Sequence, residues 1–228
     1  MIAIILLGQL VTAATAAAQP RGLLGQPRVS LNGGAIFPAD DADQIPLGTG
    51  MSLGAVAAYP VLPYLDLRID TEYGRFDNSD VHYQDRDMDI TSESIAIVLG
   101  GRLHAFPDQT IDPFVSAGVG YGGFKVAGQV FTSVIDGVAF NAGPFSEKRD
   151  SVLYEIGSGV EWRVTHRLTA QLLGEYFDAR TLDGDNDDFV CGALLHYWIT
   201  DHIGIGAQST VGLEVGDVFV HGRVTLGL

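Results

Sequence analysis

The chain has 228 residues, which is enough for one domain and too short to suggest two. Its formal net charge is −15, and this acidic excess excludes nucleic-acid binding, because phosphate contacts require Lys and Arg. The single cysteine, Cys191, excludes an internal disulfide, so the fold must gain its stability in another way.

The N-terminal segment has the composition of an export signal. An apolar stretch that begins at Met1 passes into small residues and ends in Ala16-Ala17-Ala18, which fits the Ala-x-Ala pattern of a cleavage site. We therefore expect a signal peptide at 1–18, a short leader at 19–27 and one mature domain at 28–228. A transmembrane anchor is the alternative, but the segment is rich in Ala, Thr and Gln, which insert poorly. No cysteine follows the expected cleavage site, so a lipid anchor is not predicted.

The mature sequence alternates with the period of a β-strand. In 64–73, Leu65 and Leu67 fall on one face, whereas Asp66 and Arg68 fall on the other. The hydrophobic fraction is 46%, yet no run after the signal peptide approaches the length of a helical membrane span. The alternation, bounded by prolines that mark strand ends, predicts ten strands: 28–37, 49–59, 64–76, 93–106, 113–127, 151–164, 167–178, 188–199, 203–214 and 217–228.

The predicted connections alternate between long and short. The long ones lie at 38–48, 77–92, 128–150 and 179–187, and the short ones at 60–63, 107–112, 165–167 and 200–202. Outer-membrane barrels have this asymmetry, with long extracellular loops and short periplasmic turns. Two short turns also resemble each other, because 164–168 reads Val-Thr-His-Arg-Leu and 199–203 reads Ile-Thr-Asp-His-Ile. In each, a three-residue loop places both apolar flanks on one face.

The charged strand positions favour an all-β fold that is a closed antiparallel transmembrane β-barrel, rather than a soluble sandwich. Only two lysines occur, Lys125 and Lys148, and the charged faces combine arginines with carboxylates. Arginine is favoured where fixed contacts with carboxylates are partly desolvated, as in a narrow lumen. We expect a network of lumen ion pairs that blocks the barrel, with Arg68 and Arg102 near its centre. Its predicted members are Arg28, Asp66, Arg68, Asp70, Glu72, Arg102, Glu155, Glu161, Arg163, Glu175, Glu214 and Arg223.

Aromatic residues lie near the ends of the predicted strands. Aromatic rings prefer the headgroup level of a bilayer, so two belts of them are typical of a membrane barrel. General enrichment of aromatics in strands is the alternative, but it does not explain their position at strand ends. The predicted periplasmic belt is Tyr59, Tyr64, Phe106, Trp162 and Tyr197, and the predicted outer belt includes Tyr73, Tyr121, Tyr154 and Tyr176.

The last hairpin decides between ten strands and eight. Both numbers are even and return the C-terminus to the periplasm. Residues 203–214 and 217–228 each alternate, and a hairpin left outside the barrel would expose an apolar edge. We therefore expect 217–228 to pair with 28–37, whereas an eight-stranded barrel requires 188–199 to pair there.

Two stretches resemble a known family. Residues 112–124 have a Pro-aromatic start followed by Gly-x-Gly-Tyr-Gly, and 157–176 resemble the next hairpin of outer-membrane β-barrels of the OmpA/OmpX-like and small porin-like kind. The resemblance implies an integral protein of the Gram-negative outer membrane, inserted by the barrel-assembly machinery and in contact with membrane lipid and lipopolysaccharide. The chain departs from this family in its extra hairpin and in ending at Leu228, where the family usually ends in Phe.

No catalytic, cofactor or metal site is predicted with specific residues. No histidine stands in the His-x-Ser arrangement of barrel deacylases, and His82, in an acidic outer loop, is the only one placed like a residue of an omptin-type protease site. The run 183–188 superficially resembles a calcium loop, so Asp183, Asp185 and Asp187 are weak metal candidates, but its Gly is misplaced. Solvated, mutually repelling loops are the simpler explanation.

The sequence therefore predicts a non-enzymatic, monomeric outer-membrane barrel that has a structural or surface-interaction role. A narrow channel for ions or small solutes is the first alternative, and an outer-membrane enzyme acting on lipid A or peptides is the second. Seven acids and five arginines at predicted lumen positions favour a filled interior over a channel, because unpaired charges there are costly.

Overall fold

The computed structural model describes residues 27–37, 49–83, 86–135, 138–140, 143–181, 184–213 and 217–228, and their side chains except at 78–88, 130–142 and 179–186. The predicted signal peptide and most of the leader lie outside these residues. The strands are β1 (Arg28–Phe37), β2 (Gly50–Leu62), β3 (Leu65–Tyr83), β4 (Arg86–His104), β5 (Ile111–Ile135), β6 (Val138–Phe140), β7 (Gly143–Arg163), β8 (Leu168–Thr181), β9 (Gly184–Trp198), β10 (Ile203–Gly212) and β11 (Val218–Gly227). Among the described residues, no helix has the length and apolarity needed to cross a membrane.

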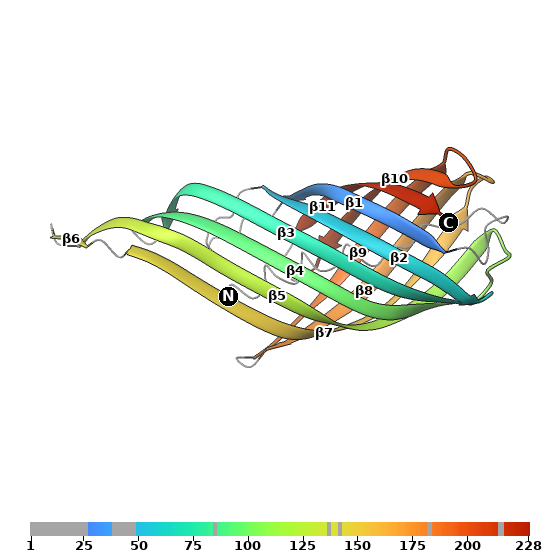
Figure 1. Ribbon diagram of the computed structural model, residues 1–228, viewed down its shortest axis with the longest axis horizontal. Coiled ribbons are helices and arrows are strands. Elements are labelled where there is room, and N and C mark those ends of the chain that lie inside the picture. The colour runs from blue at the N-terminus through green and yellow to red at the C-terminus, as the bar shows by residue number, and fades with distance from the viewer. Residues whose placement is uncertain are drawn as a thin grey trace.

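All of these strands except β6 close into one antiparallel barrel, which Figure 1 shows from the side. Each strand pairs with its neighbour in sequence, apart from the short β6, which pairs only with the end of β5. Closure occurs between β11 and β1, in a register that runs from Arg28↔Gly227 to Phe37↔Val218. The predicted ten-stranded barrel is thus confirmed. The eight-stranded alternative is wrong, because β9 pairs with β8 and β10 instead of β1.

Four neighbouring strands extend well beyond the others at one end. β3 and β4 have 19 residues each, β5 has 25 and β7 has 21, whereas β1, β10 and β11 have 10 each. In Figure 1 these long strands form a curved wall that projects to one side. The expectation of long loops at 77–92, 128–150 and 179–187 is therefore wrong for most of their residues, which continue the β-ladder instead.

The opposite end is closed by short turns, and two of these have the same hydrogen bonds. In the β7–β8 turn, the Thr165 amide donates to the Leu168 carbonyl (3.1 Å) and the Leu168 amide donates to Thr165 Oγ1 (3.0 Å). In the β9–β10 turn, Thr200 and Ile203 make the same two bonds at 3.1 and 3.0 Å. A threonine in the first loop position thus closes both turns, which explains why their sequences resemble each other.

The two faces of the barrel have opposite character. Outward side chains such as Leu99, Ile156 and Leu172 are 58%, 62% and 66% exposed, whereas Arg68 and Glu175 are 2% and 1% exposed in the interior. This inverts the usual distribution in a soluble protein, and it suits a barrel whose outer face contacts lipid. Closure also matters here, because a backbone group in lipid has no water with which to bond.

Candidate functional site

Among the described residues, many charged side chains lie inside the barrel lumen, at several positions along the barrel. Nearest the short turns, Arg28 on β1 forms an ion pair with Asp66 on β3 (Nη2 to Oδ2, 2.5 Å). On the intervening strand β2, Ala58 pairs with Arg28 on one side and with Arg68 on the other, and Asp66 pairs with Pro60. A small side chain at this position leaves room for the arginine to reach across β2.

A histidine links this ion pair to a second carboxylate. His104 Nδ1 lies 2.7 Å from Asp112 Oδ2, and His104 Nε2 lies 3.7 Å from Asp66 Oδ2. Asp112 is completely buried, and its other oxygen accepts a hydrogen bond from the Phe106 amide (2.9 Å). On the facing wall, Trp198 packs edge-on against His196, with ring centroids 4.8 Å apart. These groups fill the lumen near its short-turn end.

The next layer contains buried charges of both signs. Arg68 donates to Asp70 over 2.9 Å, and both side chains are nearly inaccessible. Arg102 is fully buried, with its guanidinium carbon 4.0 Å from the centre of the Phe114 ring. Arg223 donates to Gln208 Oε1 over 3.1 Å. The carboxylates of this layer that are also buried are Asp70, Glu72, Glu155 and Glu175.

Buried apolar side chains lie beside these charges in the interior. One buried cluster comprises Ala96, Val98, Leu153, Phe177 and Val190, which project from β4, β7, β8 and β9. A second comprises Ile36, Phe76 and Phe219. The described lumen thus holds buried charged side chains and buried apolar clusters next to one another.

The remaining predicted lumen positions have varied surroundings. Arg163 Nε lies 3.5 Å from Glu161 Oε1, with both side chains largely buried. Glu214 and Asp183 lie outside the described residues, and so does the side chain of Asp185. Asp187 is exposed and accepts a hydrogen bond from Tyr176 (2.9 Å). No group of three or more His, Cys, Asp or Glu side chains in the described part of the chain is arranged to hold a metal ion.

The sequence reasoning missed Asp112, because it placed this residue in a short turn at 107–112. The ladder instead begins at Ile111, so Asp112 is the first inward residue of β5. Its signal was present in the sequence, because Asp112 lies in phase with Phe114 and Ser116, which also point inward.

A serine and a histidine also meet in the lumen. Ser52 Oγ on β2 lies 2.5 Å from His221 Nε2 on β11, and both residues are 2% exposed. This contact has the geometry of a nucleophile and its base. Substrate access would be required for catalysis, and the neighbouring side chains Ile36, Phe76 and Phe219 are completely buried.

Glycines make space for these interior side chains. A Cβ atom on Gly157 would lie 2.5 Å from Glu175 Cγ and 2.8 Å from Ser116 Oγ. We therefore expect Gly157→Ala to lower the free energy of unfolding by about 1–3 kcal/mol, a typical cost of overpacking. A urea titration of the refolded barrel in lipid measures this change. The matched control is Gly222→Ala, where the nearest atom lies 3.8 Å away and little change is expected; equal effects of the two substitutions would contradict the assignment.

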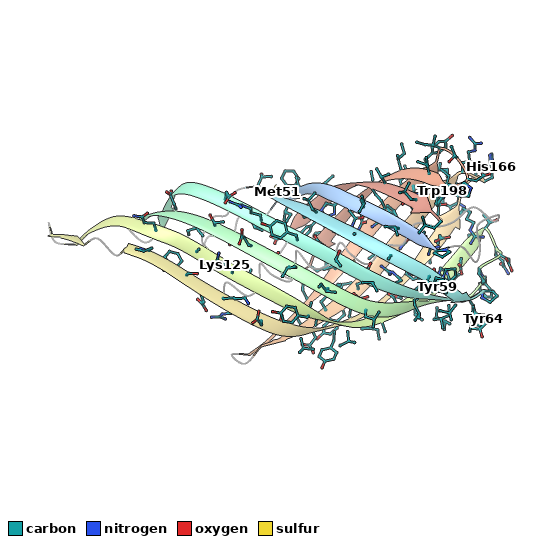
Figure 2. All side chains as sticks on the ribbon, viewed as in Figure 1. Met51, Tyr59, Tyr64, Lys125, His166 and Trp198 are labelled. Atoms are coloured by element: carbon teal, nitrogen blue, oxygen red, sulfur yellow. The ribbon has the colours of Figure 1, made fainter. Side chains whose placement is uncertain are left out.

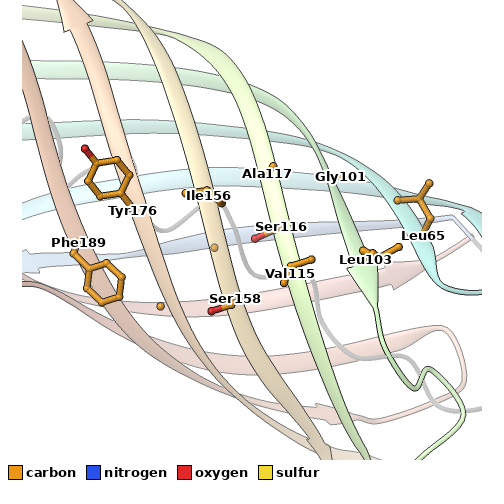
Figure 3. A pocket seen from close by; sticks show the side chains of 12 residues that line it. Leu65, Gly101, Leu103, Val115, Ser116, Ala117, Ile156, Ser158, Tyr176 and Phe189 are labelled. Carbon is orange, nitrogen blue, oxygen red and sulfur yellow. The ribbon is translucent and has the colours of Figure 1, made fainter.

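The predicted belt aromatics point outward. Their exposed fractions lie between 38% and 59%, except for Tyr73, which is half-buried. Figure 2 places Tyr59 and Tyr64 at the same end as His166, and Lys125 toward the long strands. Between the two predicted aromatic belts, a shallow apolar groove of about 610 Å³ crosses the outer surface (Figure 3). Gly101, Ala117 and Gly174 leave space there among larger side chains.

Comparisons with known proteins agree with this architecture. No protein-family model and no curated protein matches the sequence. Among solved structures, the chain is similar to the translocator domain of the autotransporter NalP from Neisseria meningitidis (TM-score 0.54, 13% identity, covering 89% of this chain and 88% of that one). It is also similar to the outer membrane protease OmpT from Escherichia coli (TM-score 0.59, 7% identity, covering 95% and 100%). At these identities the likeness shows the fold.

The fold and the outer surface together define the class of protein. The chain is a closed β-barrel of the outer-membrane kind, and its apolar outward face suits a lipid environment. Its location is accordingly the bacterial outer membrane. Membership of the OmpA/OmpX-like group is a narrower expectation that rests on the sequence resemblance.

Proposed function

We propose that the protein is a non-conducting barrel of the outer membrane that has a structural or surface-interaction role. The observation that carries this proposal is the central layer of the lumen, where Arg68, Arg102 and Glu175 are each no more than 2% exposed. A water-filled pore would leave such side chains accessible. The buried apolar clusters beside them add a second obstruction.

The long strands supply the surface that such a protein presents. With the short turns in the periplasm, β3, β4, β5 and β7 extend into the extracellular space. Their exposed side chains near 143–150 are mostly polar or charged. We further propose that the protein is a monomer, that the barrel-assembly machinery inserts it, and that lipopolysaccharide surrounds its outer half.

Planar-bilayer recording of the refolded protein tests the proposal. We expect no stable porin-sized conductance steps, because buried charges and apolar side chains occupy the lumen. A faster-migrating unheated band in detergent gels confirms that folded barrels were used, and a porin refolded in the same lipid serves as the positive control. Stable steps from the wild type would instead favour the narrow-channel alternative.

A second candidate function is hydrolysis, which the contact between Ser52 and His221 favours. If the pair is structural, purified protein will not hydrolyse ester or peptide substrates above the level of a Ser52→Ala variant. Activity that disappears in Ser52→Ala would support an enzyme. The omptin-like candidate His82 has its side chain outside the described residues.

A further inference from the structure

The two lysines of the chain lie side by side on the outward face of the barrel. Lys125 on β5 is directly opposite Lys148 on β7 in the ladder, and their side chains are 52% and 67% exposed. Like charges directly opposite each other on neighbouring strands destabilise a sheet. The chain has a net charge of −15 and only these two lysines. An anion bound by both of them would offset the repulsion between their charges.

The contacts of the two ammonium groups are compatible with the binding of an anion. Lys125 Nζ lies 3.8 Å from Glu93 Oε2 on β4, and Lys148 Nζ lies 3.4 Å from Asp150 Oδ1 on its own strand. Each lysine thus contacts a different carboxylate, and no single anion in the described structure contacts both. A phosphate, by contrast, has several strong acceptor oxygens and can bind both ammonium groups at once.

The nearby arginine is already engaged. Arg75 donates to both oxygens of Asp77, over 2.7 and 3.0 Å, and this hydrogen bonding lowers the pKa of the Asp77 carboxyl. A hydrogen bond from Tyr121 (2.5 Å) likewise lowers the pKa of Asp150. Both carboxyl groups are therefore charged at neutral pH. Asp77 offsets the charge of Arg75, so the two lysines are the cations of this surface that we consider for binding an anion.

An apolar groove lies directly beneath the lysines. It has a volume of about 240 Å³, and its lining includes Lys125, Lys148, Glu93, Tyr73, Ile95, Tyr121 and Gly123. Tyr73 and Tyr121 belong to the predicted outer belt, so the groove lies where headgroups meet acyl chains. Gly123 opens the space, because even a Cβ atom there would lie 3.3 Å from Ile95 Cγ2. Basic groups above an apolar groove match a phosphorylated lipid.

We propose that Lys125 and Lys148 together bind a phosphate of a phosphorylated glycolipid in the outer leaflet, with one of its acyl chains in the groove between Tyr73 and Tyr121. This inference rests on the membrane orientation given under the proposed function, and it assigns the lipid contact to a definite site. Glu93 and Asp150 border the site and limit it to one phosphate by repelling a second.

Native mass spectrometry of the full chain, refolded in detergent, tests the site. The probes are bisphosphorylated lipid A, the same lipid after phosphatase treatment, and phosphatidylglycerol. We expect one molecule of lipid A to be retained in preference to the other two. Lys125→Gln and Lys148→Gln should each weaken retention about fivefold, the scale expected for one basic residue near an anionic headgroup. Asp150→Asn should strengthen it, because a repelling carboxylate is removed.

The control is Arg167→Gln, which removes a basic side chain that is exposed in a periplasmic turn and should leave retention unchanged. Equal retention by the wild type and both lysine variants would overturn the proposal, as would equal retention of the dephosphorylated lipid. Retention that survives both lysine substitutions but disappears with EDTA would also overturn it, in favour of carboxylates bridged by a divalent cation. Conductance reports only on the lumen, so a failed lipid site is distinguishable from a failed blocked-barrel proposal.

Discussion

Replacing Arg68 with alanine should lower the free energy of unfolding of the barrel by about 3–5 kcal/mol, the typical cost of leaving a buried charge without its partner. Arg68 and Asp70 are 2% and 1% exposed, so Asp70 cannot recover its lost hydrogen bond from bulk water. Glu155 and Glu175 in the same layer would then face one cation fewer. Denaturant titration of the protein refolded into lipid vesicles measures the loss.

Two further variants separate an effect of charge from an effect of lost volume. Arg68→Met keeps most of the side-chain volume but not the charge, so it should be nearly as destabilising as Arg68→Ala. The double variant Arg68→Met with Asp70→Leu removes both charges and should recover much of the loss. Asp201→Ala, in the exposed β9–β10 turn, is the control for a charge that contacts water and should change stability little. An Arg68→Ala effect no larger than that of Asp201→Ala would contradict a buried, packed network.

The alternation of apolar and polar residues predicted the barrel because the membrane imposes a strict difference between the two faces of each strand. Within the bilayer, each outward residue contacts lipid and each inward residue contacts the lumen, so a shift of one residue would reverse both. The pattern from Ile203 to Gly212 therefore identified strand β10, and the pattern from Val218 to Gly227 identified the closing strand.

Above the membrane this difference disappears, which is why the strand extensions could not be predicted. Residues 143–150 read Gly-Pro-Phe-Ser-Glu-Lys-Arg-Asp, and most of them are exposed although they belong to β7. When both faces of a strand contact water, polar residues are tolerated on each, and the sequence resembles a loop. Pairing with β5 nevertheless extends as far as Gly143.

Sequence periodicity also predicts on which face of a strand a residue lies, but it does not predict which residue that side chain contacts. It places Arg28 and Asp66 in the lumen, but it does not show that they meet across β2, which depends on the small side chain of Ala58. The mixture of charged and apolar residues in the interior is hidden for the same reason. Phe177 of the apolar cluster lies opposite Glu155 in the ladder, which only the strand register reveals.

Contact with lipid restricts the residues that the outward face tolerates, as packing does in the lumen. A single substitution can test this restriction. Leu99 on β4 is 58% exposed and lies between the two predicted aromatic levels, next to Ile69 and Val119 on the adjoining strands. If this surface contacted water, Leu99→Arg would be nearly neutral. In a membrane it should cost about 2–4 kcal/mol, the range for arginine near the bilayer midplane.

The matched variant is Val61→Arg, which is also outward, 47% exposed, and close to the β2–β3 turn. Near the interface the expected cost falls to about 0–1 kcal/mol, because the guanidinium reaches the headgroups. Unfolding titrations of both variants in the same vesicles give the comparison. The difference between them depends on depth in the bilayer and not on lost packing, since both side chains point away from the lumen. Equal, small effects at Leu99 and Val61 would mean that lipid does not surround the barrel at the level of Leu99.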